Sequence, residues 1–450
     1  MSRNRNREKS TKDIDIREFD TENTVEEDRF VLKDAIVRVK ESFLGQLGDK
    51  KESVREQSAR KMSSDEMISL PDKLKLYPRR SQIKYILAAL VLLIAGIGFG
   101  VYRYTYVCRS YTVLSSEERS DDSETRYVTL KKGCTLKCNP NGVTCVSGSG
   151  EVQWNTTFTM QNLIVDVCDS TAVVADQKGS EIYVFNEKGL VGHFSPEHLL
   201  TKVKVTRQGV VAAVLEDGDV TWVNVYDSQG NILVRNKTSM TETGYPVDMD
   251  ISSDGLKMII SYLGINHNNV ESRVVFYNFS SVGQDRESNL VNKVCYEGHV
   301  VPEVRFMNDN YAVAFRDDGV TIFRGTQVPE ERSSITFDRE IISVFSDDDY
   351  FGIVTESDEE EETHKFKLQL YRANGTRCFT DYLNMEYSDI QISKKEILLY
   401  NSNEMRIYTA GGRLKAEAVY EKPIISMSSA GGLRKYTIVT LDSTDTIKVR

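Results

Sequence analysis

Cysteines are the residues of this sequence whose type and spacing most readily suggest chemistry. The sequence contains seven, all after residue 107: Cys108, Cys134, Cys138, Cys145, Cys168, Cys295 and Cys378. Cys138 and Cys145 bracket Asn141-Gly142, a dipeptide typical of a two-residue hairpin turn. Such a turn places residues 138 and 145 opposite each other, with Cα atoms about 4.5–5.5 Å apart and within disulfide reach. We therefore expect a structural disulfide between Cys138 and Cys145, with Cys134 as the alternative partner for either.

Patterns typical of metal or cofactor binding are weak. The five histidines lack the H-x-x-x-H or H-E-x-x-H spacing of a zinc site: His193, His198, His267, His299 and His364. The acidic run 356–363 lies between two apolar segments, as a solvated hairpin tip does, and it lacks the alternating acidic pattern of a calcium loop. The sequence predicts no metal and no cofactor.

Enzyme motifs are also missing from the sequence. It has no G-x-S-x-G motif, phosphate-binding loop or dinucleotide fingerprint in a strand-to-helix setting. Its only tryptophans are Trp154 and Trp222, and it lacks the vicinal cysteine pair of a quinone-dependent dehydrogenase. We therefore expect no catalytic residues. The net charge of -10 argues against a nucleic-acid partner.

One apolar stretch determines how the rest of the chain is organised. Residues 85–102 read YILAALVLLIAGIGFGVY and carry no charge. As a helix they would reach roughly 27 Å, close to the ~30 Å core of a bilayer. Basic residues gather on the amino side, at Lys73, Lys75, Arg79, Arg80 and Lys84. The sequence thus predicts one transmembrane helix in the plasma membrane, with the N-terminus in the cytoplasm and the C-terminal part outside. The cysteines, all on the outer side, agree with an oxidising exterior.

Two features around this helix suggest contacts with partners. Gly96 and Gly100 share one helix face, where the backbone of a second copy could approach, so self-association into a homodimer is one expectation. The alternative is that these glycines only give flexibility near a helix end. Residues 1–80 are expected to be a partly disordered cytoplasmic tail. Within them, the apolar periodicity over 25–61 predicts an amphipathic helix, either solitary or docking a cytoplasmic partner.

Beyond a polar spacer at 103–126, short runs rich in Val, Ile, Thr, Tyr and Phe alternate with x-Gly turns, which is typical of strands and tight hairpins. The runs recur in units roughly 35 to 55 residues apart, the spacing of four-stranded propeller blades. The units are 133–154, 163–194, 203–235, 249–279, 304–326, 341–379, 388–414 and 424–450. We therefore predict an all-β fold, a β-propeller over 127–450 with eight blades, or alternatively seven. The last unit has three strands, so a strand from 127–132 is expected to complete it and close the ring.

Two motifs carry a resemblance to known proteins. Residues 141–154, N-G-V-x-x-V-x-x-x-G-E-V-x-W, resemble the blade ending of quinoprotein-type propellers, and residues 251–255, I-S-S-D-G, resemble a turn of bacterial surface-layer-type propellers. The whole chain resembles an uncharacterised family of Gram-positive single-pass membrane proteins with an extracytoplasmic quinoprotein-like propeller. This resemblance implies an architecture and no established activity.

The predicted architecture favours a non-catalytic platform at the cell surface. Its partners would be proteins or cell-envelope glycans bound by the propeller. One alternative is a quinoprotein-like or other propeller enzyme, and a second is a transmembrane sensor that signals to a cytoplasmic partner. A central channel lined by convergent polar groups would favour the enzyme, and a featureless channel with an apolar rim would favour binding.

Overall fold

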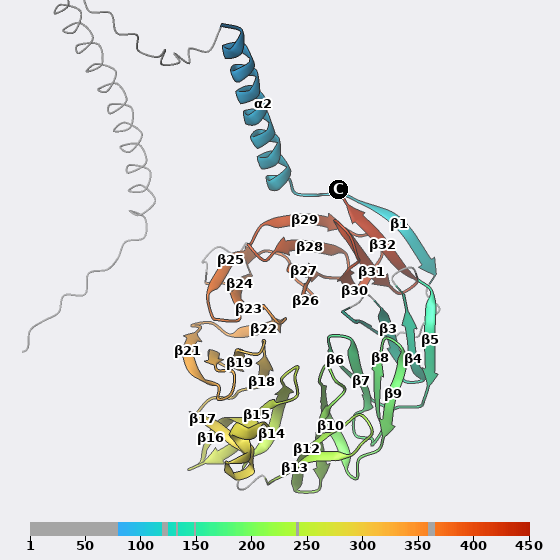
Figure 1. Ribbon diagram of the computed structural model, residues 1–450, viewed down its shortest axis with the longest axis vertical. Coiled ribbons are helices and arrows are strands. Elements are labelled where there is room, and N and C mark those ends of the chain that lie inside the picture. Colours follow the sequence, from blue (N-terminus) through green and yellow to red (C-terminus); the bar gives the residue numbers. More distant parts are fainter. Residues whose placement is uncertain (1–79, 119–124, 132–133, 148–149, 240–242, 359–364) are drawn as a thin grey trace, which may run out of the picture. The chain divides into compact units, whose positions relative to one another are not determined.

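The structure is a computed structural model that describes residues 80–118, 125–131, 134–147, 150–239, 243–358 and 365–450. The chain divides into two units, Met1–Leu90 and Val91–Arg450, and the second contains every described strand (Figure 1). The predicted cytoplasmic tail, apart from Arg80, and the predicted amphipathic helix at 25–61 lie outside the described residues.

Helix α2, Arg80–Thr105, contains the apolar stretch that was predicted to cross a membrane. Its described large apolar side chains are exposed, among them Leu87 and Leu92. Across the described ranges, no helix is both long enough and apolar enough to cross a membrane, so the predicted span is not supported. Gly96 and Gly100 lie on α2, where a Cβ at either position would meet no atom within 4 Å. Self-association through these glycines stays a prediction.

Eight four-stranded antiparallel sheets are formed by the described strands, and Figure 1 shows them following one another around a ring. The fold is therefore an eight-bladed β-propeller, as predicted, and the alternative of seven blades was wrong. In blades 1 to 7 the strands pair in chain order, so the first strand of each sheet faces the ring centre.

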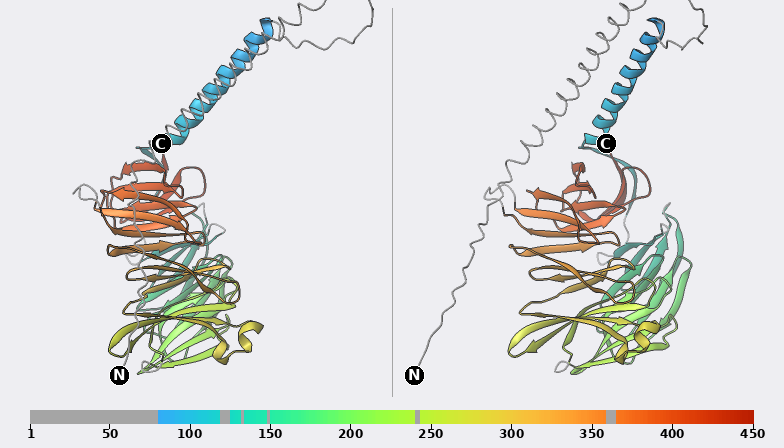
Figure 2. Two further views of the ribbon diagram at one scale, coloured as in Figure 1. Left: turned by 90° about the vertical axis from the view of Figure 1, so that its left-hand side faces the viewer. Right: turned by 60° about the vertical axis from the view of Figure 1, so that its left-hand side comes forward.

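The first four blades take up residues 126–297. Blade 1 consists of β2 (Arg126–Thr129), β3 (Thr135–Asn139), β4 (Gly142–Val146) and β5 (Val152–Thr157). Blade 2 consists of β6 (Leu163–Cys168), β7 (Thr171–Asp176), β8 (Ile182–Asn186) and β9 (Gly189–Phe194). Blade 3 consists of β10 (Leu199–Val205), β11 (Val211–Asp217), β12 (Val220–Tyr226) and β13 (Ile232–Ser239). Blade 4 consists of β14 (Tyr245–Ile251), β15 (Lys257–Asn266), β16 (Asn269–Asn278) and β17 (Leu290–Glu297). Between β16 and β17 lie α3 (Ser281–Gln284) and the 3-10 helix η1 (Glu287–Asn289), drawn in yellow in Figure 2.

The remaining blades complete the ring. Blade 5 consists of β18 (Glu303–Phe306), β19 (Tyr311–Arg316), β20 (Gly319–Arg324) and β21 (Glu330–Thr336). Blade 6 consists of β22 (Ile341–Ser346), β23 (Tyr350–Glu356), β24 (Phe366–Arg372) and β25 (Arg377–Leu383). Blade 7 consists of β26 (Asp389–Ser393), β27 (Glu396–Tyr400), β28 (Glu404–Thr409) and β29 (Leu414–Val419). Blade 8 consists of β30 (Ile424–Ser429), β31 (Lys435–Thr440), β32 (Ser443–Val449) and β1 (Tyr111–Glu118).

Blade 8 joins the two ends of the propeller. Strand β1 pairs with β32, from Tyr111 opposite Val449 to Glu118 opposite Ser443. The prediction that residues 127–132 complete this blade was wrong, because residues 127–129 belong to β2, the inner strand of blade 1. The completing strand lies instead within the expected spacer, whose sequence 114–118, L-S-S-E-E, is too polar for a buried strand. Its polarity fits its position, because β1 forms the outer edge of blade 8 and is mostly exposed.

The hydrophobic core lies between adjacent blades. Middle strands such as β7 and β11 are buried on both faces, which explains their nearly continuous apolar sequences, TAVVAD and VAAVLED. Clusters of buried residues then join neighbouring sheets, for example β7 and β8 with β10 and β11. Each blade is thus stabilised by its two neighbours, and the cluster between blades 7 and 8 includes the buried Cys108.

The first hairpin of blade 1 differs from the predicted register. Its strands place Asn139 opposite Gly142 and Cys138 opposite Val143, so Cys145 lies opposite Leu136. The loop residues are therefore Pro140 and Asn141 instead of the Asn-Gly pair. Because of this shift, the Cys138–Cys145 disulfide was wrong: Cys145 is bonded to Cys134, the alternative partner, and Cys138 is a buried free thiol.

Candidate functional site

The inner strands of blades 2 to 5 carry charged side chains of alternating sign into one cavity. Asp166 lies on β6, Lys204 on β10, Asp250 on β14 and Arg305 on β18. These four strands face the ring centre in Figure 1. Inner strands of a propeller present alternate side chains to the axis, so one charge per strand is sufficient to form a polar lining.

The two aspartates are held by the neighbouring blade. Asp166 Oδ2 accepts the backbone N–H of Val205 at 2.9 Å, and Asp250 Oδ2 accepts that of Phe306 at 2.7 Å. Lys204 Nζ lies between them, 3.3 Å from Asp166 Oδ1 and 4.0 Å from Asp250 Oδ1. Each carboxylate therefore satisfies a backbone donor of the next blade and also a shared ammonium group.

The same arrangement recurs two residues earlier on β10, β14 and β18. Asp248 of β14 accepts the N–H of Val304 in β18 at 2.9 Å, and its other carboxylate oxygen receives a hydrogen bond from Lys202 at 2.8 Å. Charged hydrogen bonds of this kind contribute about 1.5–3 kcal/mol each. The aspartates therefore serve first to fix the inner strands to one another.

Protonation in the cavity reflects burial balanced against neighbouring charge. Burial raises the pKa of Asp250, only partly offset by Lys204 and Arg305. Burial opposes the charge of Lys204, but Asp250 and Asp166 outweigh it and raise the pKa of its ammonium group. Burial likewise opposes the charge of Arg305, and the surrounding carboxylates, led by Asp250, raise its pKa. The lining thus holds fixed positive charges among carboxylates.

Arg305 differs from Asp166, Lys204 and Asp250 on the neighbouring inner strands. In the described part of the chain, its guanidinium donates no hydrogen bond and lies within ion-pair distance of no other group. It is partly buried and lines the cavity beside Phe306. An arginine side chain has five N–H donors in a planar fork. The cavity therefore contains a strong donor whose bonds are not used by the protein.

The rim of the cavity is formed by turns that follow the inner strands. Asp169, after β6, is paired with Arg207, after β10, and with Lys131 Nζ at 2.6 Å. Arg207 also donates to Ser253 Oγ at 3.3 Å. Hydrogen bonding from Lys131 lowers the pKa of Asp169 and keeps it ionised. These pairs tie together the turns of blades 1, 2, 3 and 4.

Blades 5 and 6 contribute two further rim carboxylates. Asp309 follows β18 and Asp348 lies in the turn between β22 and β23. Within the described ranges, neither carboxylate takes part in a hydrogen bond or an ion pair. Burial raises the pKa of Asp348, and the nearby Asp169 raises it further. The rim therefore offers negative charge that a cation would stabilise.

The cavity has a volume of about 240 Å3 and a polar lining. Among the described residues that line it there is no histidine. Cys168 is the thiol at this site, and burial raises its pKa to about 11, so it is protonated at neutral pH. The arrangement can bind charged groups through Arg305 and the rim, and among the described residues that line the cavity no nucleophile is paired with a base.

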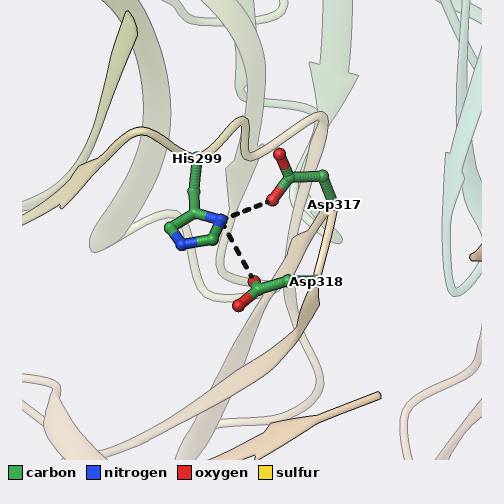
Figure 3. A group of neighbouring side chains, drawn as sticks. All are labelled: His299, Asp317 and Asp318. Carbon is green, nitrogen blue, oxygen red and sulfur yellow. Dashed lines mark hydrogen bonds and ion pairs between the residues drawn. The ribbon is translucent and has the colours of Figure 1, made fainter. Parts of the chain in front are cut away.

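A second cluster lies in two turns outside the cavity. His299, after β17, meets Asp317 and Asp318 of the β19–β20 turn, with Nδ1 3.0 Å from Asp317 Oδ1 (Figure 3). The three side chains are close enough to share a metal ion. Their atoms already have partners, because Arg316 Nε donates to Asp318 Oδ1 at 2.7 Å and Val300 N–H donates to Asp317 Oδ2 at 3.1 Å. We assign this cluster to the hydrogen bonding of the turns.

The residues singled out from the sequence do not lie in the cavity. Cys138 and Cys145 are in blade 1, and Gly96 and Gly100 are in α2. A signal for the cavity was nevertheless present, because isolated charges interrupt the apolar inner strands at L-I-V-D-V-C and Y-P-V-D-M-D-I. Which of these charges become neighbours depends on the order of the blades around the ring and on the register of the strands in each sheet. The sequence pattern alone gives neither.

The chain is similar to one protein family and to several solved structures. The model of one protein family, a family of unknown function (DUF5711), matches residues 104–449. No curated protein matches the chain. Among solved structures, BamB from Moraxella catarrhalis has a TM-score of 0.46 and 11% identity, over 75% of this chain and 100% of that one. The Pan2 WD40 domain of Neurospora crassa has a TM-score of 0.40 and 9% identity, over 76% and 96%. Kuenenia stuttgartiensis hydrazine synthase has a TM-score of 0.40 and 10% identity, over 73% and 96%.

Proposed function

The chain belongs to DUF5711, a family of unknown function, and we propose that its propeller is a non-catalytic binding module centred on the charged axial cavity. The observation that carries this proposal is the unused guanidinium of Arg305 in a cavity whose other inner-strand charges are paired. Hydrogen bonds from a guanidinium to an anionic acceptor are strong, charge-assisted bonds, and a partly buried site strengthens them relative to water. A ligand that supplies the acceptor would therefore bind with a net gain.

The polar groups of the cavity support binding more than catalysis. Convergent polar groups were expected to favour an enzyme, but here Asp166 and Asp250 are occupied by backbone N–H groups and by Lys204. A general base needs a lone pair within reach of the substrate, and a nucleophile needs an activating neighbour. Cys168, with its raised pKa and without an adjacent histidine, has neither.

We further propose that the module is held at the outer surface of the plasma membrane by residues 85–102. This part of the proposal rests on the sequence: the run carries no charge, and basic residues precede it. The exposed apolar side chains of α2 support it, because Leu87, Leu92 and their neighbours need a covering that the described chain does not supply. The predicted protein or glycan partner and the homodimer stay predictions.

Thermal unfolding of the purified full chain in the presence of a panel of small charged and polar compounds tests the binding module. Three proteins are compared: wild type, Arg305→Gln, and Arg332→Gln. Arg332 provides the matched control because it lies on β21, the outer strand of the same blade. We expect at least one compound to raise the unfolding temperature of the wild type and of Arg332→Gln, and to have no effect on Arg305→Gln.

Two results would contradict the proposal. A compound that stabilises all three proteins equally would bind elsewhere, and a panel without any hit would leave the cavity without a ligand. Conversion of a bound compound into a product, followed by mass spectrometry over the same incubation, would overturn the non-catalytic assignment.

A further inference from the structure

The charges of the axial cavity differ between its interior and its rim. In the interior, Arg305 is the group without a partner among the described residues, while Asp166 and Asp250 are paired. At the rim, the carboxylates without a partner among the described residues are Asp309 and Asp348. The cavity therefore presents an unused positive charge inside and unused negative charge at its opening.

Simple anions and cations each fit only one part of this arrangement. A phosphate or a dicarboxylate would meet Arg305 but would also approach Asp250, Asp309 and Asp348, which repel it. An isolated amine would satisfy the rim and leave the guanidinium of Arg305 without an acceptor. Like charges close together in a partly buried site are costly, so neither class is well matched.

Resting on the proposed binding function, we propose that the cavity binds a small zwitterion, with its carboxylate on Arg305 and its ammonium group at Asp309 and Asp348. A carboxylate accepts two parallel hydrogen bonds from a guanidinium, which is the strong bidentate geometry. The volume of about 240 Å3 accommodates a molecule of the size of a free amino acid.

The lining also explains why the ligand would be held in one orientation. Lys204 is close to Arg305 in the interior but is already shared by two aspartates, which leaves the guanidinium as the main anchor. Arg207 at the rim is occupied by Asp169 and Ser253, so it competes little for the carboxylate. The ammonium group would also lower the raised pKa of Asp348 by stabilising its charged form.

Calorimetric titration of the full chain with ω-amino acids of increasing length tests this inference. The probes are glycine, β-alanine, 4-aminobutanoate and 5-aminopentanoate, with butanoate and butylamine as the matching half-molecules. We expect one zwitterion to bind at least about tenfold more tightly than either half-molecule, because two charge-assisted contacts add. Arg305→Gln should remove that advantage, the double variant Asp309→Asn/Asp348→Asn should weaken binding to the level of butanoate, and Arg332→Gln should change nothing.

The outcomes separate the ligand class from the binding function. Equal affinity for butanoate and for the best zwitterion, or zwitterion binding that survives Arg305→Gln, would overturn the inference. If no zwitterion binds while another compound from the thermal panel depends on Arg305, the zwitterion assignment fails and the binding module stands. If nothing depends on Arg305 in either experiment, both fail. Circular dichroism of each variant establishes that the propeller is folded.

Discussion

At the residue scale, the function of each charged side chain follows from its number of partners. Asp166 and Asp250 each bind a backbone N–H and share Lys204, so they act as connectors between blades. Arg305 also lies on an inner strand, but it lacks such partners among the described residues. We therefore regard Arg305 as a binding group and the two aspartates as structural groups. This difference between the paired aspartates and Arg305 is the basis of the proposed site.

The disulfide of blade 1 provides a prediction at this scale. Cys134→Ser opens the Cys134–Cys145 bond and should lower the free energy of unfolding by about 2–4 kcal/mol, because the unfolded chain regains freedom. Urea titration without reductant measures the difference, and it should disappear when a reductant is added to both proteins. Cys295→Ser, which changes an exposed free thiol, is the control. Equal stability of wild type and Cys134→Ser without reductant would show that this bond is not formed.

At the element scale, strand β1 determines whether the ring is closed. It covers the edge of β32, which would otherwise expose unpaired backbone groups. Asp445 of β32 is buried and accepts hydrogen bonds from Ser116 of β1 and from Tyr420. Tyr111 of β1 also packs against Tyr420, with ring centroids 5.0 Å apart. One buried carboxylate thus joins the first strand to the last blades.

Asp445→Asn tests this closure through the pH dependence of stability. Burial alone would raise the pKa of Asp445, but its hydrogen bonds outweigh burial and the pKa is lowered. A lowered folded-state pKa means that the stabilisation is complete above the unfolded pKa of about 3.9 and is lost as the pH falls through the folded value. We expect Asp445→Asn to cost about 1.5–3 kcal/mol at pH 7, and the cost to shrink below about pH 4.

Urea titrations at several pH values measure this difference. The control is Asp442→Asn, which changes an exposed carboxylate in the turn before β32. A difference between wild type and Asp445→Asn that stays constant from pH 7 to pH 3 would contradict the assigned role.

The sequence predicted the repeating elements well and their pairing less well. Apolar runs and x-Gly turns identified eight units, because a strand buried between two blades has to be apolar. Strand β1 was missed because an outer edge strand can be polar, and its pairing with β32 spans almost the entire propeller. The disulfide was misassigned because the hairpin loop is formed by residues 140–141 instead of 141–142, and this shift changes the partner of every residue across the hairpin. The cavity depends on contacts between blades, such as Lys204 with Asp166, which strand periodicity does not encode.

At the scale of the whole molecule, the proposal places a closed propeller outside the cell on a membrane-anchored chain. Protease treatment of intact cells, compared with lysed cells, tests this location. We expect the propeller to be degraded or released in intact cells while an epitope at the N-terminus stays protected, and the chain to remain with the membrane after alkaline extraction. Protection of the propeller in intact cells would contradict the outward orientation, and extraction by alkali would contradict the anchor.

The proposed function makes the axial cavity a binding site anchored on Arg305. A crystal structure of the full chain soaked with the compound that gives the largest thermal stabilisation tests it most directly. The compound should lie in the cavity at the ends of β6, β10, β14 and β18, with an acceptor atom within hydrogen-bond distance of the Arg305 guanidinium. A compound bound on another surface, or a guanidinium paired with Asp250 and closed to ligand, would contradict it.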